Sequence, residues 1–201
     1  MQRSPSTPKY INDICDLSRF FYRGYNTNLS PLPGIFIFHK RECDPKKCTA
    51  LKLGRLKLAR IVYRISSLPV GSLLLHPYCN TYVSSADKDV VVEKGLSAID
   101  CSWNRIVTDL KVRRYAARKL PFLLAANPTH YAIPYKLSTL EAIAAALYIV
   151  GFKENSIEFL NKTKWGHTFM ELNEAPLKDY LNARNSDEVA KIDALYRKEY
   201  E

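Results

Sequence analysis

Short apolar runs recur along the first two-thirds of the chain, and loop-like or helix-like sequence separates each run from the next. The runs that we interpret as strands lie at residues 35–38, 61–65, 73–75, 96–99 and 122–126. Neighbouring parallel strands need a long crossover connection, and buried parallel strands read as uninterrupted apolar runs. The pattern therefore predicts an α/β fold with a mostly parallel sheet.

The last third of the chain has the periodicity and the caps of helices. Ser138 and Glu141 form a capping-box pattern ahead of an apolar stretch, and Gly151 stands where that helix should end. Ser84, Ser85 and Gly95 suggest caps for another helix within residues 84–95, although Val90, Val91 and Val92 favour a strand. We predict helices over residues 84–95, 142–150, 154–162, 166–173, 176–183 and 186–200.

These patterns divide the chain into three parts. Residues 1–30 mix Ser, Pro, Asn and aromatic residues without a period, and we interpret them as an irregular extension. Residues 31–119 are expected to form an α/β domain, and residues 120–201 a helical domain. No internal repeat or low-complexity tract is found.

Lysine and arginine are unevenly distributed along the 201 residues. Residues 1–153 hold 23 Lys and Arg against 10 Asp and Glu, whereas residues 154–201 hold 7 against 10. A basic body with a mildly acidic tail favours a polyanion such as RNA, although a solvated basic surface has the same composition. Our candidates for phosphate contacts are Lys46, Lys47, Lys52, Arg55, Arg60, Arg113 and Arg114.

Several classes of protein are excluded by what the sequence lacks. No apolar run approaches about 18 residues, and the N-terminus has no signal-peptide pattern, so we expect no membrane association and a cytoplasmic location. No GxGxxG or Walker motif is present. His39, Cys43 and Cys48 have a poor spacing for zinc and no fourth ligand nearby in sequence, so we expect no metal.

Asp100 and Trp103 directly follow the strand-like run at residues 96–99. Ligands of parallel sheets bind beyond the carboxyl ends of the strands. A carboxylate and an indole placed there are candidates for a binding site, and an N-cap aspartate beside a packed tryptophan is the structural alternative.

Seven segments together resemble the family of small-subunit rRNA aminocarboxypropyltransferases, and they occur in the family's order. They are CDPKKCT at residues 43–49, LHP at 75–77, SSADK at 84–88, DCSW at 100–103, LPFLLAANP at 120–128, KLSTLEA at 136–142, and WG at 165–166 with ELN at 171–173. The resemblance covers about residues 34–185. It implies a SPOUT-like fold, with a trefoil knot in the N-terminal part followed by an all-helical C-terminal part that completes the cofactor site.

The resemblance also implies S-adenosylmethionine as the cofactor and assigns residues to it. Leu75, Pro77 and Leu120 are expected to enclose the adenine, and the Ile99 backbone to meet the ribose. Thr49, the Tyr135 backbone and Thr139 are expected to hold the amino-acid end. Trp103 is expected to cover the sulfonium methyl group, so that the larger 3-amino-3-carboxypropyl group is transferred.

The implied reaction is transfer of that group to N3 of a uridine or pseudouridine, with N1-methylpseudouridine as the expected base. Asp100 is the expected catalytic base, and hydrogen bonding between its carboxylate and the bound cofactor is the alternative role. The expected partner is small-subunit rRNA within the pre-ribosomal subunit. We expect a monomer, since no dimer signal is found.

Three other interpretations remain open at this point. The first is RNA methyl transfer by the same SPOUT-type fold, and the second is a non-catalytic ribosome-assembly factor that binds rRNA through its basic face. The third is a cysteine-based metal module, because the segment around Cys43 and Cys48 resembles the ferredoxin-like start of the RNase L inhibitor ATPases.

Overall fold

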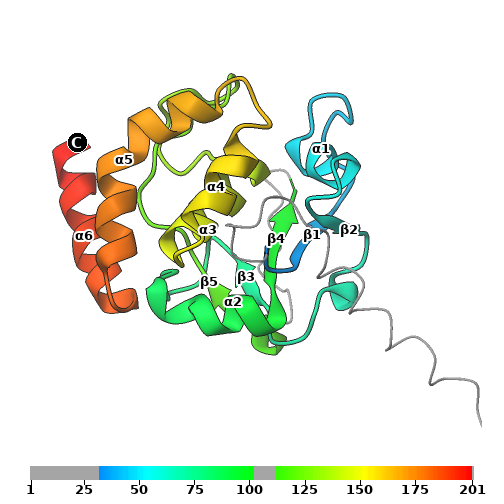
Figure 1. Ribbon diagram of the computed structural model, residues 1–201, viewed down its shortest axis with the longest axis horizontal. Helices are drawn as coiled ribbons and strands as arrows, with labels where there is room; N and C mark the ends of the chain where they lie inside the picture. The colour runs from blue at the N-terminus through cyan, green and yellow to red at the C-terminus, as the bar shows by residue number, and fades with distance from the viewer. Residues whose placement is uncertain (1–31, 102–111, 201) are drawn as a thin grey trace, which may run out of the picture. The chain divides into compact units, whose positions relative to one another are not determined.

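Five parallel strands form the centre of the structure, a computed structural model that describes residues 32–101 and 112–200 (Figure 1). Across the sheet the strand order is β2-β1-β4-β3-β5. The bounds are β1 Ile35–His39, β2 Arg60–Val62, β3 Leu73–Leu75, β4 Leu96–Asp100 and β5 Ala116–Arg118. Because every strand in this sheet runs in the same direction, their carboxyl ends lie along one edge.

The central strands are apolar because both of their faces are covered. All of β3 and the first three residues of β4 are buried, whereas β1 alternates between buried and half-buried positions. Two serines, Ser72 and Ser97, are fully buried here, and their hydroxyl groups share a hydrogen bond of 2.7 Å. That bond satisfies polar atoms that would otherwise be buried without a partner.

Helices cover the sheet and extend from it to one side (Figure 1). Helix α3 contacts β4 and α1, α2 contacts β3, and α5 contacts α3, α4 and α6. The bounds are α1 Thr49–Arg55, α2 Lys88–Lys94, α3 Thr139–Ile149, α4 Lys153–Leu160, α5 Gly166–Asn182 and α6 Ser186–Tyr200, with short 3₁₀ turns at Ile65–Ser67, Ser85–Asp87 and Val112–Arg114.

Helix α3 is buried along almost its whole length, and both of its predicted caps are confirmed. The Ser138 hydroxyl accepts from the Glu141 amide, and the Glu141 carboxylate accepts from the Ser138 amide. At the other end Gly151 has φ 94°, and the amides of Gly151 and Phe152 donate to the carbonyls of Tyr148 and Leu147. This is the Schellman pattern of a helix that ends on glycine.

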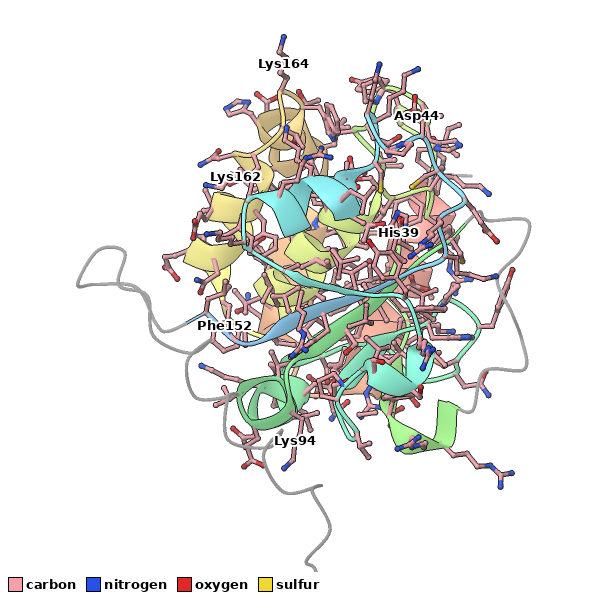
Figure 2. The ribbon with its side chains drawn as sticks, turned by 90° about the vertical axis from the view of Figure 1, so that its right-hand side faces the viewer. His39, Asp44, Lys94, Phe152, Lys162 and Lys164 are labelled. Carbon is pink, nitrogen blue, oxygen red and sulfur yellow. The ribbon has the colours of Figure 1, made fainter. Side chains whose placement is uncertain are left out.

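Charged side chains mostly point outward, with a few buried exceptions. Figure 2 shows Lys94, Lys162 and Lys164 at the periphery, whereas His39 lies within the molecule. Glu141 and Asp193 are fully buried as well. Buried charged groups need several hydrogen-bond partners, so these residues mark places where the fold is organised around a polar side chain.

The predicted strands at residues 35–38, 73–75 and 96–99 are confirmed as β1, β3 and β4. The ambiguous segment 84–95 is helical, with a 3₁₀ turn leading into α2. The weaker run at residues 61–65 contributes only its first part to β2, because the 3₁₀ turn begins at Ile65.

The predicted SPOUT-like arrangement is wrong. Residues 32–101 and 112–200 give no indication of a knotted N-terminal part followed by an all-helical C-terminal part; they form one parallel sheet with helices packed on it. Residues 119–138 are not helical, and they include the bridges Tyr82–Lys119 and Leu124–Pro134. Helix α3 also packs directly on β4, so the C-terminal helices cover the sheet.

Two local predictions are also wrong. The apolar run at residues 122–126 is not a strand of the sheet. It lies in a loop between prolines, where all of its residues except the half-buried Leu124 are buried. The two helices predicted over residues 166–173 and 176–183 are one helix, α5, which continues through Pro176 and ends at Asn182. Proline removes one hydrogen bond within a helix, but the packing of α5 against α3, α4 and α6 keeps the helix continuous.

No helix among the described residues has the length and apolar character needed to cross a membrane.

We expect Glu141→Ala to lower the free energy of unfolding by about 2 to 4 kcal/mol. The Glu141 carboxylate accepts from the Ala126 amide, the Asn127 side chain and the Ser138 amide at 2.9, 2.8 and 2.7 Å, and these donors would lose their acceptor. Urea unfolding measures the change. The exposed Glu171→Ala is the control, with an expected change within about 0.5 kcal/mol; equal losses in both variants would refute this account.

Candidate active site

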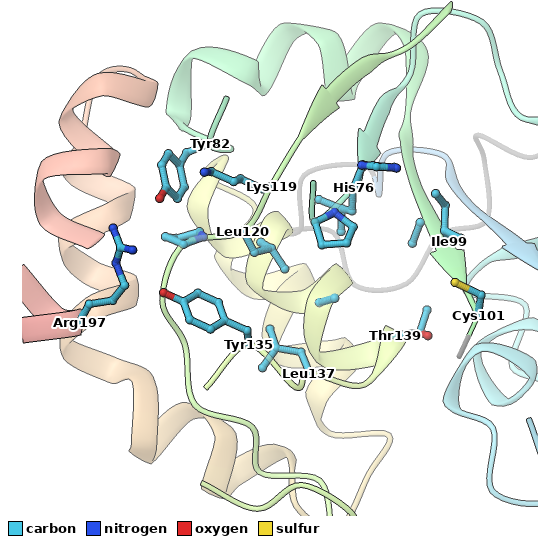
Figure 3. A pocket seen from close by; sticks show the side chains of 15 residues that line it. His76, Tyr82, Ile99, Cys101, Lys119, Leu120, Tyr135, Leu137, Thr139 and Arg197 are labelled. Carbon is cyan, nitrogen blue, oxygen red and sulfur yellow. The ribbon is translucent and has the colours of Figure 1, made fainter. Parts of the chain in front are cut away.

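A cavity of about 410 Å³ opens at the carboxyl ends of β3, β4 and β5 (Figure 3). This volume lies in the usual range for pockets that bind small molecules. The residues that follow the strands line one side, and the start of α3 with the loop before it lines the other. The lining residues are Leu75, His76, Pro77, Tyr82, Ala98, Ile99, Cys101, Lys119, Leu120, Pro121, Tyr135, Leu137, Thr139, Ala142 and Arg197.

Six of the eight residues that the sequence assigned to a cofactor line this one cavity, among the residues that the structure describes. They are Leu75, Pro77, Ile99, Leu120, Tyr135 and Thr139. They come from four separate segments of the chain, which the parallel sheet and α3 bring together. Trp103 lies outside the described residues.

Thr49, the remaining predicted cofactor residue, does not line the cavity. It is the first residue of α1, and its hydroxyl accepts a hydrogen bond of 3.4 Å from the Leu140 amide in the first turn of α3. Thr49 therefore connects the two helices beside the pocket.

One end of the cavity carries Tyr82, Lys119, Tyr135 and Arg197, and the opposite end carries Ile99, Cys101 and Thr139, with Leu120 between them (Figure 3). The Lys119 ammonium lies 4.2 Å from the centre of the Tyr82 ring. The middle of the pocket is mainly apolar, with His76 as its polar member, and the other polar side chains lie toward the ends.

Asp193 anchors the end of the pocket near α6. Its carboxylate accepts from the Tyr82 hydroxyl at 2.9 Å and from the Phe122 amide at 2.6 Å, and it pairs with Arg197 at 3.0 Å. Burial and the hydrogen bond to Asp193 raise the pKa of Tyr82 to about 12. Tyr82 therefore acts as a donor over the whole neutral range.

Asp100, the predicted catalytic base, is the last residue of β4 but is not part of the cavity lining. Its Oδ1 accepts a hydrogen bond of 2.5 Å from the Thr139 hydroxyl. Its Oδ2 lies 3.3 Å from His39 Nε2 and 3.5 Å from the sulfur atoms of Cys43 and Cys48. Both oxygens are thus engaged, and Thr139 separates the carboxylate from the pocket.

Tyr135 has a backbone conformation that is rare for a bulky residue, with φ 63°. Its amide donates to the Leu123 carbonyl, and its ring packs edge-on against Phe122 at 5.7 Å. Such strained residues are concentrated at functional sites, where the surrounding structure holds them in place.

The structure divides the predicted RNA-binding residues between the two edges of the sheet. Lys46, Lys47, Lys52 and Arg55 lie on α1 or in the turn before it, and Arg60 begins the adjacent edge strand β2. Arg113 and Arg114 are exposed in the 3₁₀ turn before β5, at the other edge. The edge strands are four inter-strand spacings, or about 19 Å, apart.

Sequence reasoning did not assign four polar residues of the pocket: His76, Tyr82, Lys119 and Arg197. His76 and Lys119 adjoin residues that the resemblance did assign, so the neighbouring positions could have indicated them. Arg197 reaches the pocket from α6, and no local pattern could have revealed that contact.

Comparison with known proteins gives matches over most of the chain. A family model described as "Ribosome biogenesis protein, C-terminal" matches residues 73–197, and one described as "Possible Fer4-like domain in RNase L inhibitor, RLI" matches residues 34–64. The 16S rRNA aminocarboxypropyltransferase of Methanosarcina mazei is 43% identical over 165 residues, which are 81% of this chain and 94% of the relative. The chain belongs to the 16S rRNA aminocarboxypropyltransferase family.

Other members of the family are similarly close. The enzyme of the same name from Methanothermobacter thermautotrophicus is 46% identical over 160 residues, or 79% of this chain and 95% of the relative. The solved structure of the SAM-dependent rRNA:acp-transferase Tsr3 from Vulcanisaeta distributa aligns with a TM-score of 0.74 and 41% identity, over 83% of this chain and 97% of that one. This member of the family therefore shares the α/β fold of a solved aminocarboxypropyltransferase.

We expect Tyr82→Phe to reduce the loss of stability that this family member shows at high pH. An unfolded tyrosine has a pKa near 10, whereas the folded pKa of Tyr82 is about 12. Tyr82 thus stabilises the fold fully below about pH 10, and this contribution declines as the pH rises toward 12. Urea unfolding at about pH 9 and pH 11 measures the effect. Tyr131→Phe, which changes an exposed tyrosine outside this network, should keep the pH dependence of the parent's unfolding free energy. The same pH dependence in Tyr82→Phe would contradict the hydrogen bond from Tyr82 to Asp193.

Proposed function

We propose that this protein transfers a 3-amino-3-carboxypropyl group from S-adenosylmethionine to N3 of a (pseudo)uridine in small-subunit rRNA, with N1-methylpseudouridine as the base. The observation that carries the proposal is the convergence of Leu75, Pro77, Ile99, Leu120, Tyr135 and Thr139 on one cavity. Membership of the aminocarboxypropyltransferase family supports the same chemistry.

The cavity suits this cofactor in both size and chemistry. Its apolar middle, made by Leu75, Pro77 and Leu120, fits the flat adenine ring, while the polar ends fit a ribose and an amino-acid group. Thr139 offers a hydroxyl at the first turn of α3. When bound, S-adenosylmethionine supplies an aminocarboxypropyl carbon that its sulfonium activates towards attack, and methylthioadenosine remains after transfer.

The protein's own contribution is to position the reactants. Residues 31–119 would provide the carboxyl edge of the sheet, and residues 120–201 would complete the pocket through Tyr135, Leu137 and Thr139. Thr49 would act indirectly, because its hydroxyl holds the first turn of α3. Holding reacting atoms in line is among the largest contributions to catalysis of such a displacement.

We assign Asp100 a positioning role in place of direct proton abstraction. Its Oδ1 accepts from Thr139, which lines the pocket, so the carboxylate fixes the direction of that hydroxyl. A general base must lie within hydrogen-bond reach of the proton that it removes. The Asp100 carboxylate could reach the pocket only after its hydrogen bond with the Thr139 hydroxyl breaks.

RNA binding would use the basic residues at both edges of the sheet. Lys46, Lys47 and Arg60 at one edge and Arg113 and Arg114 at the other are exposed. Lys46 and Lys47 follow β1 on the carboxyl side of the sheet, whereas Arg60, Arg113 and Arg114 lie at the amino ends of β2 and β5. An RNA that contacts both groups must therefore extend from the carboxyl side of the sheet, where the pocket lies, past its edges to the amino side. We propose that a single copy of the chain acts on the small-subunit precursor.

Transfer assays with labelled cofactor test this function. We expect rRNA to acquire label from carboxyl-labelled S-adenosylmethionine and none from methyl-labelled S-adenosylmethionine. Ala142→Phe should lower cofactor affinity at least about 100-fold, or about 2.7 kcal/mol, because Ala142 lines the cavity and a phenyl ring would occupy it. The same substitution at exposed Ala194 is the control.

The alternatives predict different labelling. Methyl label in the RNA would identify a methyltransferase. RNA binding without cofactor binding would identify a non-catalytic assembly factor. Either result would refute the proposed reaction.

Removing two cations at the β5 edge should weaken RNA binding in a salt-dependent way. For the double variant Arg113→Ala/Arg114→Ala we expect the slope of log affinity against log salt to become shallower by about 1.4 to 1.8. The control, Lys191→Ala/Lys198→Ala, removes the same charge from exposed positions of α6. Filter binding at several salt concentrations measures both, and equal slopes in the two variants would exclude a phosphate contact at Arg113 and Arg114.

A further inference from the structure

Four side chains with metal-binding atoms converge beside the pocket. They are His39 at the end of β1, Cys43 in the following turn, Cys48 at the N-cap of α1 and Asp100 at the end of β4. Their ligand atoms all lie within 4.8 Å of one another. The expectation of no metal was based on the sequence spacing of His39, Cys43 and Cys48. The fold adds a fourth ligand, Asp100, which lies 52 residues after Cys48 in the chain.

Five of the six distances within this group match the edges of a tetrahedron around one central point, and the sixth, between the two sulfur atoms, is at most 4.8 Å. His39 Nε2 lies 3.3 Å from Cys43 Sγ, 3.5 Å from Cys48 Sγ and 3.3 Å from Asp100 Oδ2. Asp100 Oδ2 lies 3.5 Å from each sulfur. A tetrahedral zinc with Zn–N and Zn–O bonds near 2.0 Å and Zn–S bonds near 2.3 Å has edges of about 3.3 to 3.8 Å.

Hydrogen bonding alone accounts poorly for this arrangement. Without an ion, Asp100 Oδ2 is the shared acceptor for His39 and both thiols, while Oδ1 receives only the Thr139 hydroxyl. A carboxylate offers about four acceptor sites over its two oxygens, so three donors have no need to share one of them. Convergence on a single oxygen is the pattern that a central cation produces.

The fold holds these ligands in place before any ion binds. His39 and Asp100 are register partners on the neighbouring parallel strands β1 and β4, so their side chains point to the same face. His39 is only 3% exposed, and Figure 2 shows it inside the molecule, below the turn that carries Asp44. The turn itself is closed by the amides of Lys47 and Cys48, which donate to the Asp44 carbonyl.

We propose that His39, Cys43, Cys48 and Asp100 bind one Zn²⁺ ion. Two thiolates, an imidazole and a carboxylate form a tetrahedral donor set that zinc accepts, whereas a [4Fe–4S] cluster needs four thiolates. With all four positions taken by protein, the site is a closed, structural one. It joins the ends of β1 and β4 to the start of α1.

Binding has a defined proton balance. The two thiols lose their protons to solvent. The ion with two thiolates, one carboxylate and a neutral imidazole then has a net charge of −1. Burial raises the pKa of Cys43, and Cys48 and Asp100 raise it further, but a directly bound cation reverses this preference for the protonated thiol.

His39 must also change its tautomer. The Arg41 amide donates to His39 Nδ1 at 3.0 Å, which places the ring proton on Nε2 in the metal-free protein. Coordination through Nε2 moves that proton to Nδ1, so the Arg41 amide must turn away. Arg41 lies in an exposed turn with φ 61°, where a local rearrangement disturbs little of the core.

Metal content and cobalt spectroscopy of the full chain test the proposal. After exposure to ZnCl₂ and removal of free metal, we expect about one zinc per chain by mass spectrometry, and Co²⁺ should give the intense visible absorption of a tetrahedral thiolate site. Cys43→Ser and Asp100→Asn should each bind zinc at least about 100-fold more weakly. Cys79→Ser, which removes a cysteine outside the cluster, should bind like the parent.

Thermal unfolding provides a second measurement. Zinc at a hundred times its dissociation constant should raise the Tm of the parent by about 5 to 10 °C and leave that of Cys43→Ser unchanged. Cys43 is exposed, so its replacement by serine leaves the core intact. Equal zinc affinity in Cys43→Ser and the parent, an octahedral cobalt spectrum, or iron with inorganic sulfide in the purified protein would each overturn the assignment. These outcomes test the zinc site itself, and cofactor affinity is measured separately.

Discussion

The common direction of the five strands is the constraint on which the rest of the structure depends. Because β1, β4, β3 and β5 run parallel, Leu75, Asp100 and the residues after Arg118 all arrive at one edge. A slip of one residue in any of these pairings would turn the side chains of that strand to the opposite face. The register therefore determines both which residues line the pocket and which ligand atoms meet at Asp100.

Helix α3 completes the site because one buried carboxylate fixes where the helix begins. Glu141 caps its own helix through Ser138, and it also binds the Ala126 amide and the Asn127 side chain in the preceding loop. The chain between Asn127 and Ser138 must therefore return to the helix start, which places Leu137 and Tyr135 against the cavity. A single side chain thus couples the stability of the loop to the shape of the pocket.

Local patterns predicted the central strands and most of the helices, because burial and capping leave short-range signals. They missed β5, whose three residues Ala116–Arg118 are half-buried and lie within a basic stretch. They also misassigned residues 122–126, an apolar run that lies outside the sheet with one isolated bridge, Leu124–Pro134, and whose Ala126 amide binds Glu141. The knotted arrangement came from resemblance alone, since periodicity carries no information on how the chain passes through its own loops.

Residues of the site could likewise be predicted where the signal was local, and were missed where it depended on distant contacts. Six of the predicted cofactor residues line one cavity, because the short motifs that carry the resemblance include them and the sheet brings these motifs together. The Asp193 network could not be named, because Tyr82, Phe122 and Arg197 meet only after α6 has docked. A contact between segments more than 70 residues apart produces no recognisable pattern in the sequence of either segment.

Asp100 lies between the two candidate sites, and its two oxygens serve different neighbours. Oδ1 holds the Thr139 hydroxyl at the pocket, while Oδ2 faces His39 and the two cysteines. A carboxylate held on both sides has little rotational freedom, so any ordering of the turn at Cys43 also orders Thr139. The proposed zinc site would then act on the pocket by reducing the motion of the Thr139 hydroxyl, which lines the proposed cofactor pocket. This link requires no movement of the sheet, because β1 and β4 already place the turn and the pocket at neighbouring strand ends.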